Sequence, residues 1–411
     1  MKEFLASDWT LFSSDDTWQV WSVIFIAVAL SMVLSQKYKW ASLISAPVLA
    51  IIFGVLITGF KILPTSNASY TALSTYSIPL AVCMMLFNAN IKEIFKKSGK
   101  VIISFHLCVI AALVAGIAVH FTLRGATDIA TANMCAAGLT GSFIGSTPNM
   151  IAVFDSVGLS SDNPFYASMM IVANVVYSLV MIVTVWVPSS KFFHKYFPHP
   201  YEEKIGKNEI EIVEEEEKKP ITLYSICLTM ATAFTIVTVA TMLANILTNV
   251  LTVEGTDNAF AQVPAMILGN KYVLTTVITA GLVTIFPDYF DKCVGAQEIG
   301  SFLIYGYFFT IGTYGNFFSI ILNSPKLLIL LMLPQLLMLA VSLLLGKICK
   351  QNIEEIVMSF IAALGGPFVA SGTAASKGYK ELIVPVLLLG IWGNVIGTIC
   401  GILMYPIYCA F

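Results

Sequence analysis

The chain has 411 residues, of which 57% are hydrophobic and 11% charged, and its mean hydropathy is +0.85. Soluble domains carry about 25% charged residues, so this composition excludes an ordinary soluble protein and predicts an integral membrane protein. The formal net charge is −2 and the chain has no basic stripe, so we expect no nucleic-acid partner.

Apolar segments of about 18 to 25 residues, long enough to cross a bilayer as a helix, recur along the chain in two groups. The first 16 residues are polar and acidic, which is not typical of a cleavable signal peptide, so segment 18–34 is expected to be the first anchor. We expect an all-α integral membrane protein with about 11 to 13 transmembrane helices. The expected segments are 18–34, 42–60, 71–87, 101–121, 133–157, 165–187, 221–251, 272–286, 299–322, 326–345, 355–375 and 382–408.

A charged stretch divides the two groups. It contains four consecutive glutamates from Glu214 to Glu217, and a mixed-charge segment with few apolar residues cannot form a packed core. The sequence therefore predicts a first transmembrane repeat (1–187), a solvated linker (188–220) and a second repeat (221–411). The eight cysteines include no CxxC pair, so neither a disulfide framework nor a metal site is expected.

Two expected helices are interrupted by small, polar and proline residues, at 138–149 and 363–374. Pro148 and Pro367 each remove a helical N–H group, and unpaired backbone at membrane depth is tolerated only where it is buried in protein or lines a cavity. Each break is followed, at nearly the same distance, by an Asn-Val pair at Asn174 or Asn394. Paired breaks in two halves indicate the binding site of a secondary transporter. The alternative is that glycine and serine here only permit close helix packing.

The breaks and the helices after them supply hydroxyl groups, side-chain amides and exposed main-chain groups. The carbonyl and hydroxyl oxygens suit a hard cation such as Na⁺, whereas half-helix N-termini suit an anion. Within the predicted site, Thr147, Asn149 and Thr373 are the candidate Na⁺ ligands. The predicted substrate and ion site consists of Ser142, Gly145, Ser146, Thr147, Asn149, Asn174, Gly365, Gly366, Ser371, Thr373 and Asn394.

Two ionisable residues in apolar segments have two interpretations each. Asp155 is either a solvated carboxylate at a helix end or a cation and proton carrier, and His106 is either a packing residue or a proton shuttle. No acidic pair lies beside either break, although a proton antiporter normally has one, which favours Na⁺ held by neutral oxygens. The chain has no HExxH, P-loop or GxSxG motif, so we expect no enzyme.

The orientation of the second half is left open. Lysines at 37, 39, 92, 96, 97 and 100 favour cytoplasmic loops after the first and third segments, with the N-terminus outside. Twelve full crossings would then give both repeats the same orientation, whereas inverted repeats need an odd number of crossings in each half. One segment is therefore miscounted, and the suspects are 221–251 and the short stretch 260–268.

Several motifs together resemble a known family, the YjcL-like membrane proteins, which are defined as domain of unknown function 819. The motifs are Tyr-Ser-Ile-Pro-Leu at 76–80, Gly-Ser-Phe-Ile-Gly-Ser-Thr-Pro-Asn at 141–149, Glu-Ile-Gly-Ser-Phe at 298–302, Gly-Gly-Pro-Phe-Val-Ala-Ser-Gly-Thr at 365–373 and Val-Pro-Val-Leu-Leu-Leu-Gly at 384–390. The resemblance implies the cation:proton antiporter and anion transporter clan, with two crossed interrupted helices and elevator motion of a core past a panel. Gly145-Ser146 stands where the family tends to have Gly-Gly, and Ala173 where it tends to have an acid.

Together these features predict a secondary active transporter, Na⁺-coupled, that moves a small organic anion or similar solute by alternating access. We expect a multi-pass protein of the plasma membrane with Na⁺ or H⁺ as coupling ion and no other cofactor, and a homodimer is left open. Two alternatives stand beside this prediction: a cation/proton antiporter of the same fold, and a membrane sensor or scaffold that binds without transport.

Overall fold

The computed structural model of the protein describes residues 9–38, 46–159, 163–206, 220–252, 259–314 and 317–411, and every regular element in these ranges is helical. The expected all-α membrane architecture is thereby confirmed. The first half contains α2 (Thr17–Lys37), α4 (Ala46–Gly59), α5 (Ala68–Ala72), the π-helical turn η1 (Leu73–Ser77), α6 (Ile78–Met85), α7 (Ile91–Lys97), α8 (Val101–Leu123), α9 (Ile129–Val157) and α10 (Pro164–Trp186). The second half contains α13 (Leu223–Leu251), α14 (Ala259–Leu268), α15 (Lys271–Ile285), α16 (Pro287–Phe290), α17 (Ala296–Tyr314), α18 (Phe317–Ile348), α19 (Ile353–Ser376) and α20 (Lys380–Ala410).

Polar caps fix where several helices begin. The side chains of Asp128, Asn163 and Asn270 accept hydrogen bonds from backbone N–H groups in the first turns of α9, α10 and α15, respectively. Each cap satisfies an N–H group that a helix start leaves unpaired. The start of each of these helices is thus encoded locally, although most of the fold depends on packing.

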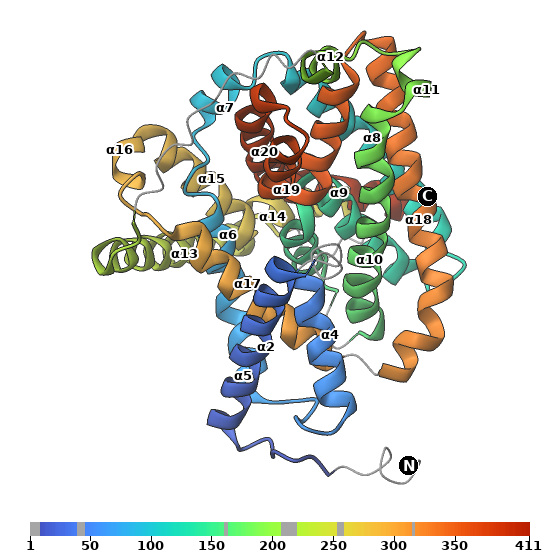
Figure 1. Ribbon diagram of the computed structural model, residues 1–411. Helices are drawn as coiled ribbons and strands as arrows, with labels where there is room; N and C mark the ends of the chain where they lie inside the picture. The colour runs from blue at the N-terminus through green and yellow to red at the C-terminus, as the bar shows by residue number, and fades with distance from the viewer. Residues whose placement is uncertain (1–8, 39–45, 160–162, 207–219, 253–258, 315–316) are drawn as a thin grey trace.

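The helices form two bundles that lie side by side (Figure 1). The hairpin bundle, at the upper right of Figure 1, consists of α8, α9, α10, α18, α19 and α20. The flanking bundle, to the left and below, consists of α2, α4, α5, α6, α13, α15 and α17. Each bundle takes helices from both halves of the chain. The division at residues 187 and 221 therefore does not separate the bundles, and it stays a prediction about sequence repeats.

Six helices in the described ranges are long and apolar enough to cross a membrane. A bent pair, 261–268 with 271–285, makes a seventh span if its two parts cross together at their angle of 55°. The expected number of about 11 to 13 also included α9 and α19, which are interrupted, and the short α4. Two further expected segments are not single helices: 71–87 is divided among α5, η1 and α6, and 299–322 is divided between α17 and α18. The six helices are Thr17–Lys37, Val101–Leu123, Ser168–Ser189, Leu223–Leu251, Lys326–Ile348 and Lys380–Ala410.

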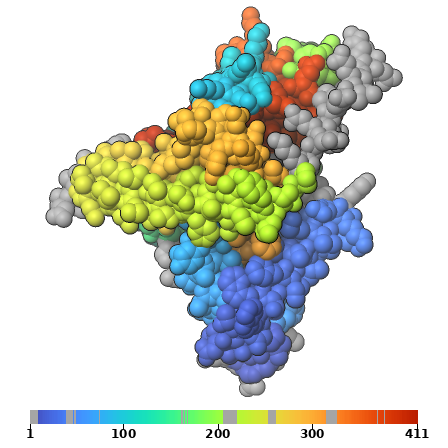
Figure 2. Space-filling model, turned by 90° about the vertical axis from the view of Figure 1, so that its left-hand side faces the viewer, coloured from blue at the N-terminus to red at the C-terminus, as the bar shows by residue number. Residues whose placement is uncertain are grey.

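Helix α13 forms much of one outer face. Figure 2 shows it as the long yellow-green helix that crosses the molecule, with side chains exposed along its length. Leu223, Phe234, Met242 and Val250 are among its exposed apolar residues. Because an exposed apolar surface of this size is unusual for a soluble monomer, the face fits contact with lipid.

The first part of the expected linker is folded. After α10 come the 3₁₀ turn η2 (Val187–Ser189), α11 (Lys191–His194) and α12 (Pro200–Gly206). Backbone N–H groups at the start of α12 bind the carboxylate of Glu354 in α19. Residues 207–219, with the Glu214–Glu217 run, lie outside the described residues.

A candidate solute site between two helical hairpins

Helix α9 is broken in its middle and folds back on itself. Gly145 (φ −136°, ψ 27°) and Ser146 (φ 63°, ψ −178°) leave helical geometry just before Pro148. A Cβ added at Gly138 would overlap the ring of Phe154, although these residues would lie about 24 Å apart in a continuous helix. The two parts of α9 are therefore antiparallel neighbours, and α9 is a hairpin with its tip at residues 145–146.

Helix α19 is a second hairpin. Its backbone leaves helical geometry at Gly366 (φ 80°, ψ −179°), directly before Pro367. The hydroxyl of Tyr201 in α12 donates a hydrogen bond to Glu355 (3.1 Å), and the Tyr201 ring lies 6.2 Å from the ring of Tyr379. A continuous helix would separate residues 355 and 379 by about 36 Å. Both ends of α19 therefore lie together, where α12 contacts them.

The two hairpins approach from opposite ends of α20. Near the base of α9, Asn133 Nδ2 lies 3.6 Å from Cys409 Sγ at the C-terminal end of α20, whereas α19 leads directly into its N-terminal end. The tips meet beside the middle of α20: a Cβ added at Gly366 would lie 3.5 Å from Ser146 Oγ.

Glycines of α20 make this meeting possible. A Cβ at Gly390 would lie 2.5 Å from Pro367 Cα, and one at Gly397 would lie 2.9 Å from the carbonyl oxygen of Gly141. Gly393 likewise lies against the carbonyl of Ile144. Small residues at this spacing let helix backbones approach closely. The glycines of α20 therefore form a groove against which both hairpins pack.

Asn149 supports the tip of α9 from the side of α20. Its Nδ2 donates to the carbonyl of Gly145, and its Oδ1 accepts from the backbone N–H (2.9 Å) and the hydroxyl (2.7 Å) of Thr398. Nδ2 also lies 3.5 Å from Oδ1 of Asn394. The side chain is buried. Asn149 thus pairs with the carbonyl of Gly145 at the break and joins the tip to α20.

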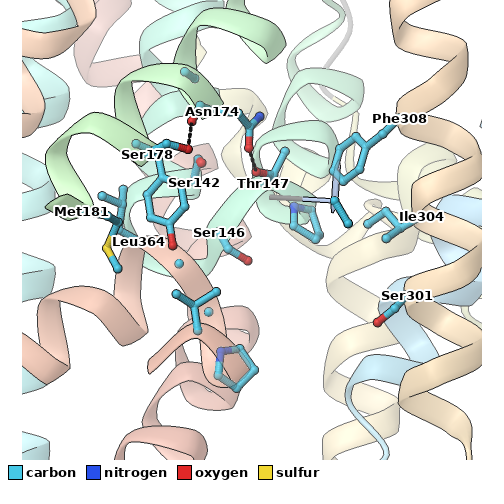
Figure 3. Close-up of a pocket in the computed structure, with 18 of the residues that line it drawn as sticks. Ser142, Ser146, Thr147, Asn174, Ser178, Met181, Ser301, Ile304, Phe308 and Leu364 are labelled. Carbon is cyan, nitrogen blue, oxygen red and sulfur yellow. Dashed lines mark hydrogen bonds between the residues drawn. The ribbon is translucent and has the colours of Figure 1, made fainter. Parts of the chain in front are cut away.

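Two hydroxyl groups of the tip, those of Ser146 and Thr147, line a cavity (Figure 3). Ser146 Oγ donates to Asn394 Oδ1 (3.3 Å), and Thr147 Oγ1 donates to Asn174 Oδ1 (3.2 Å). Asn174 in turn donates from Nδ2 to the carbonyl of Met170 (2.6 Å). The amides of Asn394 and Asn174 therefore fix the positions of the Ser146 and Thr147 hydroxyl groups in the cavity wall.

The cavity has a volume of about 750 Å³ and lies between the two bundles. Its walls come from α9, α10, α18 and α19 on one side and from α2, α4, α6 and α17 on the other. Among the described residues that line it there is no aspartate, glutamate, lysine, arginine or histidine. Figure 3 shows Ser301, Ile304 and Phe308 of α17 facing Ser142 and Ser146 across the space. Its volume falls in the range of small-molecule sites, about 300 to 1,000 Å³.

The hairpins bring most of the predicted site residues to this cavity. Of the predicted Na⁺ ligands, Thr147 and Thr373 line it, but Asn149 does not and binds Thr398 instead. Gly145, Ser371 and Asn394 are also absent from the lining. That these residues bind a solute stays a prediction. The predicted residues that do line the cavity are Ser142, Ser146, Thr147, Asn174, Gly365, Gly366 and Thr373.

The two predicted proton carriers lie elsewhere. Asp155 forms an ion pair with Lys271 (3.1 Å), and its side chain is 52% exposed. His106 is exposed, and its Nε2 lies 3.4 Å from Nε1 of Trp392. Neither residue lines the cavity.

Sequence reasoning missed the cavity residues on unbroken helices. Tyr177, Ser301, Tyr305 and Gln335 all line the cavity. Gln335 could have been found, because it is a single amide in the apolar run at 326–345 and buried polar residues in membrane helices are often functional. Ser301 and Tyr305 show no such contrast with their neighbours.

A buried carboxylate joins the base of α19 to α12. Glu354 is fully buried and accepts backbone hydrogen bonds from Tyr201 (3.1 Å) and Glu202 (3.0 Å). Burial raises the pKa of Glu354 from 4.5 to about 6, although the bonds from α12 oppose this shift. The base of this hairpin is thus held by a carboxyl group whose pKa is raised to about 6.

Comparison with known proteins agrees with a membrane location. The family described as "Protein of unknown function (DUF819)" matches residues 22–411, a range that includes both hairpins and the whole cavity lining. The "Uncharacterized membrane protein YjcL" of Bacillus subtilis (strain 168) is 28% identical over 407 residues, which cover 98% of this chain and 99% of that protein.

Proposed function

This chain belongs to the DUF819 family, and we propose that it is a secondary active transporter that moves a small solute across the membrane by alternating access. One observation carries the proposal: two broken hairpins meet beside a cavity that both bundles line. Breaks at membrane depth persist where they bind a solute or line a cavity. A site between two bodies also suits alternating access, because movement of one body past the other would open it first to one side and then to the other.

The hairpins also support an inverted relation between the two halves. In the flanking bundle, α6 of the first half packs against α13, α15 and α17 of the second half. Conversely, α17 of the second half packs against α2, α4 and α6 of the first half. If each hairpin returns to the side from which it entered, each half crosses the membrane an odd number of times. The second half is then inverted, and the twelve-span conflict disappears without an extra span in 221–251 or 260–268.

Lysines support an orientation in the plasma membrane. Helices α7, α11 and α12 lie at the same end of the molecule (Figure 1), and α7 and the α11 region carry Lys92, Lys96, Lys191 and Lys195. Short loops rich in lysine stay in the cytoplasm. We therefore propose that the base of α19 faces the cytoplasm and the base of α9 the outside.

Na⁺ is the proposed coupling ion. The cavity offers hydroxyl oxygens from Ser146, Thr147 and Thr373, and no carboxylate or imidazole is among its described lining residues. Such a set suits a hard cation better than a proton. The antiporter alternative would need Asp155 or His106, which lie outside the cavity. The expected preference for a small organic anion is supported only by the N-terminal ends at the hairpin tips, because the described lining has no cationic side chain.

The test uses purified protein in sealed vesicles loaded with a labelled metabolite extract. We expect exchange across the vesicle wall that Na⁺ accelerates and K⁺ does not, and Na⁺ should raise the melting temperature by mass action. Thr147→Val should reduce the Na⁺ effect at least tenfold. Thr235→Val is the matched control, because Thr235 is exposed on α13 and its hydroxyl bonds the carbonyl of Ala231 in the same helix. Solute binding without any exchange would overturn the carrier and favour a sensor.

A further inference from the structure

The cavity extends from the hairpin tips towards one end of the molecule. Its described lining residues on α10 run from Ala173 to Val185, in the C-terminal part of that helix. Asn174 is 9% exposed, whereas Ile182 is 55% exposed, so this wall becomes more open towards the end of α10. Met85, the last residue of α6, also lines the cavity. These two helices lead to α11 and α7, which lie at the same end as α12 (Figure 1), so the cavity opens towards that end.

Helix α15 of the flanking bundle is joined to the C-terminal end of α9 by two polar contacts. Lys271 Nζ lies 3.1 Å from the carboxylate of Asp155. Asn270 donates a hydrogen bond from Nδ2 to the hydroxyl of Ser156. Asp155 and Ser156 lie in the last turn of α9, and Lys271 and Asn270 are the first residue and the N-cap of α15. Two adjacent residues on each helix therefore connect the two bundles at one place.

A pair of tyrosines connects the bundles beside this place. The hydroxyl groups of Tyr166 in α10 and Tyr307 in α17 lie 2.8 Å apart and share a hydrogen bond, and both side chains are buried. The ring of Tyr166 lies 5.1 Å from the ring of Phe154, the residue before Asp155. On the continuous helix α10, Tyr166 and Val185 are separated by about 28 Å. The tyrosine pair therefore lies at the start of α10, far from the end towards which the cavity opens.

We propose that these contacts form a latch that closes the cavity on the side of the base of α9, and that the latch must separate before a solute can reach the site from that side. The inference rests on the proposed transporter function, and it makes this structure the state that is open towards α12. Polar contacts suit such a role because the separated groups can bind water instead, at a small net change in free energy. The latch consists of Asp155, Ser156, Tyr166, Asn270, Lys271 and Tyr307.

The first test holds the latch closed. Asp155 and Lys271 are both replaced by cysteine in the full chain, with the three exposed native cysteines changed to serine, and are joined by a short reducible thiol cross-linker in sealed vesicles. We expect solute exchange to fall at least tenfold on cross-linking and to return on reduction. The control is the same treatment of Lys204 and Glu381, an exposed ion pair that joins α12 to α20 and does not connect the two bundles. Undiminished exchange in the cross-linked latch would overturn the proposal.

The second test opens the latch and needs no solute. Ser301→Cys places a thiol in the cavity wall (Figure 3), where a membrane-impermeant reagent should label it from the side of α12. Asp155→Lys should increase labelling from the opposite side at least threefold, because it places two positive charges together. Adding Lys271→Asp should reverse this increase, a rescue that misfolding cannot produce.

The outcomes separate the latch from the carrier. Labelling that is the same in the single, double and parent proteins would overturn the latch, even if Na⁺-dependent exchange continues. Labelling that rises in the single variant and returns in the double variant, in a protein that exchanges no solute, would retain the latch and overturn the carrier.

Discussion

The two hairpins stabilise their broken tips in different ways. The tip of α9 is held by a side chain, because Asn149 bonds the carbonyl of Gly145 and reaches Thr398 in α20. The tip of α19 is held by close backbone packing of Gly366 and Pro367 against Gly390, and its base is tied to α12 through Glu354. Side-chain hydrogen bonds therefore hold the tip of α9. Close packing holds the tip of α19, and the Glu354 carboxylate holds the base of that hairpin.

The second arm of each hairpin, which runs from the tip to the C-terminal end of the helix, differs in burial in the same way as the tips differ in support. Asn149 to Phe154 of α9 are buried, whereas Val369 is 40% exposed and Gly372 has open space around it. We therefore expect substitutions that disturb the tip of α9 to lower the free energy of unfolding more than substitutions that disturb the tip of α19.

The largest expected effect comes from Asn149→Ala. The substitution removes the partner of the Gly145 carbonyl and of the N–H and hydroxyl groups of Thr398. Leaving a buried polar group unpaired lowers the free energy of unfolding by about 1 to 3 kcal/mol. We expect a loss of about 3 kcal/mol in the free energy of unfolding, measured by denaturant titration in detergent. Asn174→Ala removes an amide on the cavity side and should lower stability less. Equal losses would contradict the assignment of Asn149 as the support of the tip.

Gly390→Ala tests the packing of α19. The new Cβ would lie 2.5 Å from Pro367 Cα, and overpacking of this kind is unfavourable by about 1 to 3 kcal/mol. We expect a lower melting temperature and loss of solute exchange together. Gly372→Ala is the matched control: among the described residues, no atom outside its own stretch of helix lies within 4 Å of the added Cβ. Stability should therefore stay the same or rise by about 0.5 kcal/mol.

The raised pKa of the Glu354 carboxyl group should make the stability of the protein depend on pH. Its pKa is raised to about 6 in the folded protein, so between pH 4.5 and 6 the folded state keeps a proton that the unfolded state has released. Stability therefore falls as the pH rises through this window, by about 2 kcal/mol, and levels off above it. Glu354→Gln should abolish this fall in melting curves, whereas Glu381→Gln, at an exposed carboxylate, should retain it.

Ser146→Gly should have the smallest effect on stability, and in the opposite direction. Ser146 has φ 63° and ψ −178°, a region that only glycine adopts readily, at a penalty of about 1 to 3 kcal/mol for other residues. Glycine removes this strain but also the hydrogen bond to Asn394. We expect a net gain of about 1 kcal/mol together with reduced exchange. Reduced stability would mean that the hydrogen bond outweighs the strain.

The sequence predicted the features that depend on local chemistry. Pro148, Pro367 and the glycines beside them placed both breaks, because proline and glycine act on their own turn of the helix. The hairpin geometry could not be predicted in this way. It depends on α20, whose Gly390 and Gly393 accept the tips, and nothing near residue 145 encodes that contact.

The candidate site was predictable to the same extent. Hydroxyls next to the breaks, such as Ser146 and Thr147, line the cavity as expected. Asn149 belongs to the same motif, but it lies two residues after Thr147, about half a turn of helix, and its amide therefore bonds Thr398 instead. Gln335 stands out in the sequence as the single amide of the run 326–345, but no break marks α18, so the sequence does not place it beside the hairpins.

The bond between Asn149 and Thr398 joins residues 249 positions apart, and this distance matters while the ribosome is still at work. When the first hairpin leaves the ribosome, the helix that completes it has not been synthesised. At translation rates of about 5 to 20 residues per second, its polar tip waits for more than ten seconds. During that interval Asn149 lacks the partner that it has in the folded protein, and only the synthesis of α20 supplies it.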